Sequence, residues 1–260
     1  MTDQQIRFDD GAAYERYMGV WSRLVGERFL EWLAAPTGAR WLDVGCGNGA
    51  FTEMIVEQCA PASVAGVDPA EGQLAFARTR SALRSADFRQ GDAMALPYPD
   101  GAFDVAVMPL VIFFVPDPAK GVAEMARVVS SGGLVTAYAW DMPGGGFPYY
   151  TLQAEMRELG FAAPKPPSPH ASKEEVLRDL WIAAGLTAVE TSRIVVTRTF
   201  ADFDDYWTTI LGGPSVRAGL AAVGPEQVAT LQARMRRILP VDAAGRITYP
   251  ASANAVKGRK

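Results

Sequence analysis

The chain has 260 residues, of which 49% are apolar and 21% charged, so its composition is that of a globular protein with a sizeable core rather than a disordered chain. Its net charge is −4, which speaks against a nucleic-acid partner, since such proteins usually carry a basic face. The polar first residues do not form a signal peptide, and the longest apolar run, residues 105–115, is interrupted by Pro109 and too short to cross a bilayer. We therefore expect a cytoplasmic protein that does not bind membranes.

In the first 39 residues, Tyr14, Tyr17 and Trp21 recur at helical spacing, which predicts a helix before the first strand. From residue 40 to 140, apolar runs alternate with helical patterns. This alternation is typical of a parallel sheet covered by helices on both faces. Strands are predicted at residues 41–45, 63–67, 86–90, 103–108 and 133–139, and helices near 50–59, 70–80 and 117–129.

Past residue 140 the pattern changes, and glycine-rich and proline-rich loops occur at residues 144–146 and 164–169. Residues 141–170 and 200–243 are expected to be insertions that cap the edge of the sheet. The charged residues 257–260 are expected to be a solvated tail. Helices are predicted at residues 149–160, 172–184, 201–211 and 225–238, and strands at 187–197 and 247–256.

Residues 41–49, Trp-Leu-Asp-Val-Gly-Cys-Gly-Asn-Gly, carry the most information about a ligand. An apolar strand ends in closely spaced glycines, which let the backbone turn tightly and let a ligand approach it. In the dinucleotide-binding pattern the third glycine comes three residues after the second, but here Gly49 follows Gly47 by two. Asp43 also places a carboxylate near the turn. The stretch therefore favours a ligand with an ammonium group over a pyrophosphate.

Four further segments accompany this turn in order: Val-Ala-Gly-Val-Asp at 64–68, Gly-Asp-Ala and Leu-Pro within 91–97, Phe-Asp-Val-Ala-Val at 103–107, and the segment 124–133 ending in Ser-Ser-Gly-Gly. Together with the turn, they resemble class I S-adenosylmethionine-dependent methyltransferases. Within that class they are most similar to the small-molecule branch, which holds the quinone-biosynthesis C-methyltransferases and the methyltransferase type 11 group.

The resemblance implies an α/β fold: a doubly wound, seven-stranded, mostly parallel sheet whose last strand is antiparallel, with helical cap insertions. It implies one methyltransferase domain over residues 1–260. Within it, residues 1–39 would be a helical lid, 40–140 the cofactor-binding core, and 141–260 the substrate-side insertions and last strands. The implied co-substrate is S-adenosyl-L-methionine.

The resemblance also assigns roles at the methionine and ribose ends of the cofactor. Asp43 is expected to accept from the ammonium, and the backbone of Gly45, Cys46 and Gly47 to lie along the methionine. Asp68 is expected to accept from both ribose hydroxyls, because one carboxylate has two oxygens for two donors. Two alternatives stay open: an acid at position 43 that only caps the helix, and an acid at position 68 that also suits nicotinamide cofactors.

At the adenine end, Pro69 would lie against the ring, Asp92 would accept from its amino group, and the Ala93 N–H would donate to its ring nitrogen. Gly91 and Asp92 could instead form a plain turn. Met108 is expected at the same edge, where the fourth strand ends.

Tyr14 and Tyr17 would cover the cofactor as part of the lid, with aromatic faces suited to a sulfonium. An aromatic stripe of this spacing can equally be core.

The residues for catalysis are less defined, and none is assigned. Phe113 and Phe114 stand where the family commonly has histidines, which leaves the acceptor side apolar. The single histidine, His170, lies in the proline-rich loop and is expected to be solvated rather than a general base. Asp141 is expected to face the substrate or to be structural, and no metal site is predicted. The two cysteines, at positions 46 and 59, are expected to be reduced packing residues.

We interpret the sequence as an enzyme that transfers a methyl group from S-adenosylmethionine to a small or medium-sized, partly apolar acceptor. The alternatives are a protein or RNA methyltransferase, for which no basic groove or added domain is visible, and a non-catalytic S-adenosylmethionine-binding protein. A nicotinamide-dependent dehydrogenase is disfavoured by the glycine spacing and by Asp43.

Overall fold

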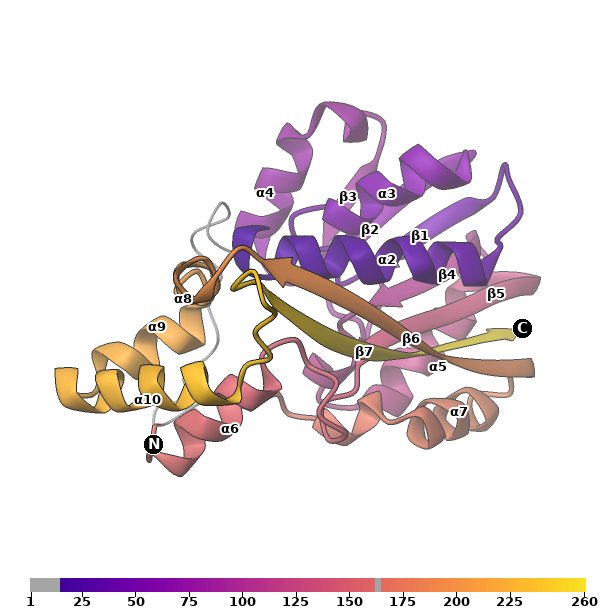
Figure 1. Cartoon of the computed structure of the whole chain (residues 1–260). Coiled ribbons are helices and arrows are strands. Elements are labelled where there is room, and N and C mark those ends of the chain that lie inside the picture. The colour runs from indigo at the N-terminus through magenta and orange to yellow at the C-terminus, as the bar shows by residue number, and fades with distance from the viewer. Residues whose placement is uncertain (1–14, 162–164) are drawn as a thin grey trace. The chain divides into compact units, whose positions relative to one another are not determined.

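A seven-stranded sheet organises the chain (Figure 1), which a computed structural model describes at residues 15–161 and 165–260. The strands are β1 (Arg40–Val44), β2 (Ser63–Asp68), β3 (Asp87–Gln90), β4 (Phe103–Pro109), β5 (Val129–Trp140), β6 (Thr187–Phe200) and β7 (Ile247–Arg259). The α-helices are α2 (Val20–Leu33), α3 (Ala50–Cys59), α4 (Glu71–Thr79), α5 (Pro118–Val128), α6 (Tyr150–Glu158), α7 (Glu174–Ala183), α8 (Phe203–Ile210), α9 (Pro214–Ala221) and α10 (Pro225–Ile238). Single-turn helices are η1 (Glu15–Gly19), η2 (Ser81–Leu83), η3 (Ile112–Phe114) and η4 (Pro169–Ser172).

The strands lie in the order β3-β2-β1-β4-β5-β7-β6. Neighbours among β1 to β5 run parallel, and β7 runs antiparallel to β5, with Ala137 opposite Val256. The prediction of a mostly parallel sheet with an antiparallel last strand is confirmed. The strand order reverses between β1 and β4, and ligands of such sheets bind beyond the carboxyl ends of the strands at that point.

Helices cover both faces of the parallel part of the sheet. The Tyr138 ring of β5 packs against Phe29 of α2 and Phe51 of α3, with centroid distances of 4.4 and 5.5 Å. The neighbouring position in β5, Ala137, pairs with Met108 of β4, whose side chain lies beside Gly121 of α5. Because successive strand side chains point to opposite faces, α2 and α3 cover one face and α5 the other.

The chain end differs from the expected solvated tail. Lys257–Arg259 belong to β7, and the ammonium of Lys260 donates to the carbonyls of Arg127 and Val129 at 3.0 and 2.9 Å. A charged segment can pair as a strand because its backbone, and not its side chains, makes the ladder. The sequence pattern also missed α9, while the other predicted helices and strands form with ends shifted by a few residues.

The described residues form two compact units. One contains residues of Met1–Trp21, Gly145–Lys165 and Val195–Ser252, and the other those of Ser22–Gly144, Pro166–Ile194 and Ala253–Lys260. In the first unit, the Tyr17 ring stacks on Tyr149 at 4.5 Å and the Trp21 indole N–H donates to the Tyr149 hydroxyl. The aromatic stripe thus takes part in the core of this unit. Tyr14 lies outside the described residues, and the lid role of Tyr14 and Tyr17 stays a prediction.

Candidate functional site

The glycine turn after β1 is held by the neighbouring strand. The N–H groups of Gly45 and Cys46 both donate to the carbonyl of Val67, at 2.7 and 3.1 Å. Gly45 and Gly47 have φ angles of 77° and 52°, in the left-handed region where a side chain is strained. A Cβ at Gly45 would also lie 2.5 Å from the Val111 side chain, which packs onto the turn.

Gly45 and Gly47 differ in the space that a side chain would have, and this difference is testable. Gly47→Ala adds a methyl group that has no neighbour within 4 Å, so it carries only the cost of the left-handed backbone. Gly45→Ala must in addition displace Val111, so we expect it to lower the free energy of unfolding by about 1 kcal/mol more. Urea unfolding of both variants measures the difference, and equal losses would show that Val111 yields without cost.

Asp68, the last residue of β2, holds the turn with one oxygen and the next loop with the other. Its Oδ2 accepts from the Gly47 N–H at 3.0 Å and its Oδ1 from the Ala70 N–H at 2.9 Å. Partial burial raises the pKa of this carboxyl, and the two backbone hydrogen bonds oppose that rise. Each carboxylate oxygen can accept a second hydrogen bond, so the pair can take two further donors.

Asp43 is a fully buried carboxyl in β1, with the turn two residues further along the chain. Its Oδ2 accepts from the Thr52 hydroxyl of α3 at 2.7 Å, whereas Oδ1 has no partner among the described residues. Its pKa is raised to about 7, mainly by burial and to a smaller extent by the charge of Asp68, against the lowering effect of the Thr52 hydrogen bond. The turn therefore lies between two acids, and a cationic ligand is the charge complement of this arrangement.

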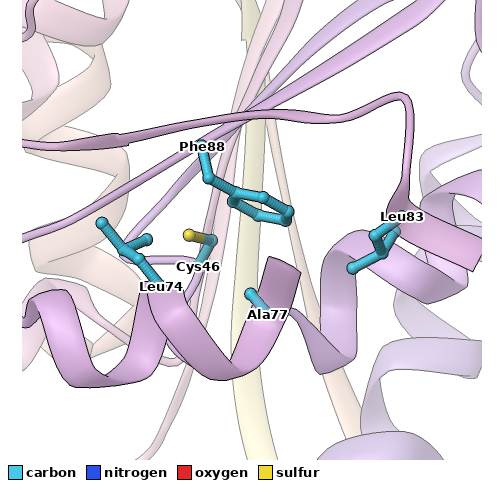
Figure 2. Packing of buried hydrophobic residues seen from close by; sticks show 5 residues of the cluster. All are labelled: Cys46, Leu74, Ala77, Leu83 and Phe88. Carbon is cyan, nitrogen blue, oxygen red and sulfur yellow. The ribbon is translucent and has the colours of Figure 1, made fainter. Parts of the chain in front are cut away.

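The side chain of Cys46 points away from the turn into a small core. Figure 2 shows it among Leu74 and Ala77 of α4, Leu83 and Phe88. Burial raises the pKa of this thiol, so it stays protonated and unreactive. Both cysteines are free thiols, as predicted, and only the backbone of residue 46 is available to a ligand at the turn.

Asp92 lies in a turn in the loop after β3, as the alternative interpretation of this residue expected. Its side-chain Oδ1 accepts from the Met94 N–H at 2.8 Å, and its backbone carbonyl accepts from the Ala95 N–H at 3.0 Å. The residue is exposed, so this turn and a ligand contact are compatible. Pro69 is exposed on the adjacent loop, and its carbonyl accepts from the Gln90 amide. Met108, by contrast, is fully buried on the α5 face, so its side chain does not lie at the surface of the edge.

Two features of the site escaped the sequence pattern. Leu110, just past β4, has a φ of 59°, and its N–H donates to the Tyr138 carbonyl at 2.7 Å. A positive φ in a non-glycine residue is uncommon and recurs at functional sites. Arg80 lies at the end of α4, where its guanidinium donates to the Asn48 carbonyl at 2.7 Å and to Glu53 at 2.6 Å. Pro109 was the sequence signal that the strand ends there, but no local pattern linked Arg80 to the glycine turn.

The remaining candidates have ordinary surroundings. His170 is exposed in η4, whose preceding residue, Ser168, donates its N–H to the carbonyl of Phe113. Asp141 accepts from the Gly144 N–H at 2.9 Å, which gives it a role in a turn. Within the described ranges, no group of three or more His, Cys, Asp or Glu side chains could hold a metal ion, and no helix is long and apolar enough to cross a membrane.

Comparison with known proteins gives a family match and matches to curated relatives. Residues 42–137 match the family described as methyltransferase domain. The demethylmenaquinone methyltransferase of Thermus thermophilus is 35% identical over 125 residues, 47% of this chain and 55% of that protein. The malonyl-[acyl-carrier protein] O-methyltransferase of Serratia marcescens is 36% identical over 113 residues, 44% of this chain and 43% of that protein. The chain thus spans about half the length of these relatives.

A solved structure shares the fold over nearly the whole chain. Phosphoethanolamine N-methyltransferase 2 of Haemonchus contortus superimposes with a TM-score of 0.61 at 17% identity, covering 99% of this chain and 59% of that one. This likeness in fold agrees with the family match. The seven-stranded sheet with an antiparallel last strand is the one that the five sequence segments predicted. Residues 42–137 of this chain are a class I S-adenosylmethionine-dependent methyltransferase domain.

Proposed function

We propose that this chain transfers a methyl group from S-adenosylmethionine to a small or medium-sized acceptor with an apolar body. The observation that carries the proposal is the glycine turn between two acids, where buried Asp43 has an unpartnered oxygen and Asp68 offers two oxygens at the strand end. A ligand with an ammonium and a ribose diol meets both requirements at once.

The proposed contacts follow from these positions. The Asp43 carboxylate would take the ammonium of the cofactor, and the backbone from Gly45 to Gly47 would lie along the methionine chain. Asp68 would accept from the ribose hydroxyls with the lone pairs that Gly47 and Ala70 leave free. The exposed loops carrying Pro69, Asp92 and Ala93 would enclose the adenine. Met108 would contribute only packing beneath the edge, since its side chain lies between β4 and α5.

The acceptor side is proposed from the end of β4. Val111 packs on the turn, and Phe114 is an exposed ring beside buried Phe113. These apolar groups favour a partly apolar acceptor. The two relatives act, by their names, on demethylmenaquinone and on malonyl-[acyl-carrier protein], and the first name supports a small-molecule acceptor here. The cytoplasmic location and the lack of a nucleic-acid partner stay predictions from the sequence.

S-adenosylmethionine supplies a methyl group that is already electrophilic. The acceptor atom attacks the methyl carbon, the carbon–sulfur bond breaks with its electron pair going to sulfur, and the acceptor loses its proton. The chain's own part is then to hold the acceptor in line and to exclude water, and such positioning can provide much of the rate increase. A general base is required only where the acceptor proton has a high pKa.

Isothermal titration calorimetry with S-adenosylmethionine, S-adenosylhomocysteine and NAD tests the cofactor. We expect both sulfur ligands to bind more tightly than NAD, because the turn spacing and Asp43 do not suit a pyrophosphate. Tighter binding of NAD would contradict the proposal. Release of S-adenosylhomocysteine in the presence of candidate acceptors then tests turnover, and binding without turnover of any of them would favour a non-catalytic binding protein.

A further inference from the structure

Asn48 lies between the last two glycines of the glycine turn. Gly47 and Gly49 have φ angles of 52° and 78°, so the backbone on both sides of Asn48 is in the left-handed region. Glycine has more backbone freedom than other residues, so a segment with two glycines keeps one conformation only where other groups fix it. The contacts of Asn48 therefore decide how well this part of the turn is ordered before a ligand binds.

Arg80 fixes this second part of the turn. The hydrogen bonds from β2 hold the first part and end at the Gly47 N–H. The Nε of Arg80 donates to the Asn48 carbonyl at 2.7 Å, and its Nη1 donates to Oε2 of Glu53 at 2.6 Å. Short hydrogen bonds of this kind, made by a charged group, are stronger than those between neutral groups. Arg80 thus joins the end of α4 to the turn and to the first turn of α3.

The backbone that carries this guanidinium is itself fixed against the turn. The Arg80 N–H donates to the carbonyl of Ala77 in α4, and the Arg80 carbonyl accepts from Leu83 in η2, both at 3.1 Å. A Cβ at Gly49 would lie 2.8 Å from the Leu83 side chain and 3.1 Å from that of Ala77, so both residues pack on the turn. Figure 2 shows the same two side chains in the small core around Cys46. The Arg80 side chain therefore begins at a fixed point beside the turn.

The pair that Arg80 forms with Glu53 is also more shielded from water than the pair of the nearby Arg78 with Glu71. The side chains of Arg80 and Glu53 are 18% and 27% exposed, whereas those of Arg78 and Glu71 are 44% and 55% exposed. Exposed ion pairs contribute little because water and salt screen them, and partly buried pairs are screened less. Glu53 can therefore keep the Arg80 guanidinium directed at the Asn48 carbonyl.

We propose that Arg80 is a positioning residue for the cofactor, which keeps the Asn48 end of the turn in the conformation that receives the methionine part of S-adenosylmethionine. The inference rests on the proposed function, in which the backbone from Gly45 to Gly47 lies along the methionine chain. A turn that is already ordered loses little conformational freedom when its ligand binds, and the affinity is higher for that reason. Arg80 has this effect without touching the cofactor.

This role separates the two halves of the cofactor. The adenosine half is proposed to lie at the loops after β2 and β3, and the second loop has its own hydrogen bond from the Met94 N–H to Asp92. The guanidinium of Arg80 bonds the turn and α3 instead. Loss of this guanidinium should therefore weaken a ligand that has a methionine part and spare a ligand that lacks one.

The experiment measures, by isothermal titration, the affinity for S-adenosylhomocysteine and for methylthioadenosine, which has the adenosine half and the sulfur but no amino-acid part. It compares the wild-type protein with Arg80→Gln and Arg80→Lys. Arg78→Gln is the matched control, because Arg78 also donates to one carboxylate, Glu71 at 2.6 Å, and to one backbone carbonyl, that of Phe88 in β3 at 3.0 Å. Thermal unfolding checks that each variant is folded.

We expect Arg80→Gln to weaken S-adenosylhomocysteine binding about tenfold, the scale of lost hydrogen bonds from a charged group, and to leave methylthioadenosine within about twofold. Arg80→Lys keeps the charge but not the forked donors, so its affinity for S-adenosylhomocysteine should lie between those of Arg80→Gln and the wild type. Arg78→Gln should leave the affinity for both ligands within about twofold of wild type, since its lost bonds lie outside the turn.

A second measurement follows the turn in the ligand-free protein. With isotope-labelled glycine, the Gly47 and Gly49 amide resonances of Arg80→Gln should broaden, because the turn then exchanges between conformations. Saturation with S-adenosylhomocysteine should sharpen them again, and Arg78→Gln should leave them as sharp as in the wild-type protein. This measurement does not require methylthioadenosine to bind.

Three results would overturn the inference: S-adenosylhomocysteine binding by Arg80→Gln that matches the wild type, an equal loss of affinity for both ligands, or Gly47 and Gly49 resonances that stay sharp in ligand-free Arg80→Gln. Failure of the wild-type protein to bind S-adenosylhomocysteine is a separate result, and it would contradict the proposed function itself.

Discussion

Replacing Asp68 by alanine is expected to weaken S-adenosylhomocysteine binding about 10- to 150-fold, or about 1.5–3 kcal/mol, the scale of hydrogen bonds to a charged group. The carboxylate would be lost as acceptor for the ribose hydroxyls, and the Gly47 and Ala70 N–H groups would lose the bonds that order the loops around the cofactor. Isothermal titration measures the loss. The fold should remain, because Asp68 lies at the end of its strand and is only partly buried.

Asp87→Ala is the matched control for this prediction. It makes the same chemical change at an exposed acid that begins β3, the strand next to β2, and whose partner is Arg89. Because Asp87 lies at the amino end of its strand, the Asp87→Ala substitution should leave the affinity for S-adenosylhomocysteine unchanged. An Asp68→Ala variant that binds as tightly as the wild-type protein would mean that the ribose is held elsewhere.

The start of β5 differs from the start that the local sequence pattern predicted. The strand was predicted at residues 133–139, after the serines and the first glycine of the Ser-Ser-Gly-Gly sequence. In the structure β5 begins at Val129, and its register against β4 jumps from Phe103 opposite Val129 to Val105 opposite Leu134. The residues that were expected to precede the strand thus lie within it and interrupt the ladder, while the backbone pairing of the two strands continues on either side. The local pattern did not show that the strand contains this irregularity.

The residues of the candidate site also differ in whether the sequence alone could reveal them. Asp43, Asp68 and the glycines could be found from the sequence because each follows from its own strand and turn. Val111 and Arg80 could not, since they meet the turn across 66 and 32 positions of sequence respectively, and such contacts depend on the packing of the whole sheet.

Replacing Asp43 by asparagine is expected to change how stability depends on pH. Burial holds the pKa of Asp43 near 7, whereas in the unfolded chain it lies near its ordinary value. Between about pH 4 and 7 the folded protein therefore holds a proton that the unfolded chain has released, so wild-type stability falls as the pH rises. Asparagine does not titrate. From pH 5 to pH 7 the variant should gain about 2–3 kcal/mol in unfolding free energy relative to the wild type.

Urea unfolding at both pH values measures this change, and Asp104→Asn is the control with the opposite electrostatics. Hydrogen bonds from Arg40 hold the pKa of Asp104 well below its usual range, so this carboxyl is ionised in both states across the interval and the control should lose a constant amount of stability. Saturating S-adenosylmethionine should flatten the wild-type profile, because an ammonium beside Asp43 favours the ionised carboxyl. If the unfolding free energies of Asp43→Asn and the wild type changed with pH in parallel, Asp43 would be ionised in the folded protein without ligand. That result would contradict the raised pKa.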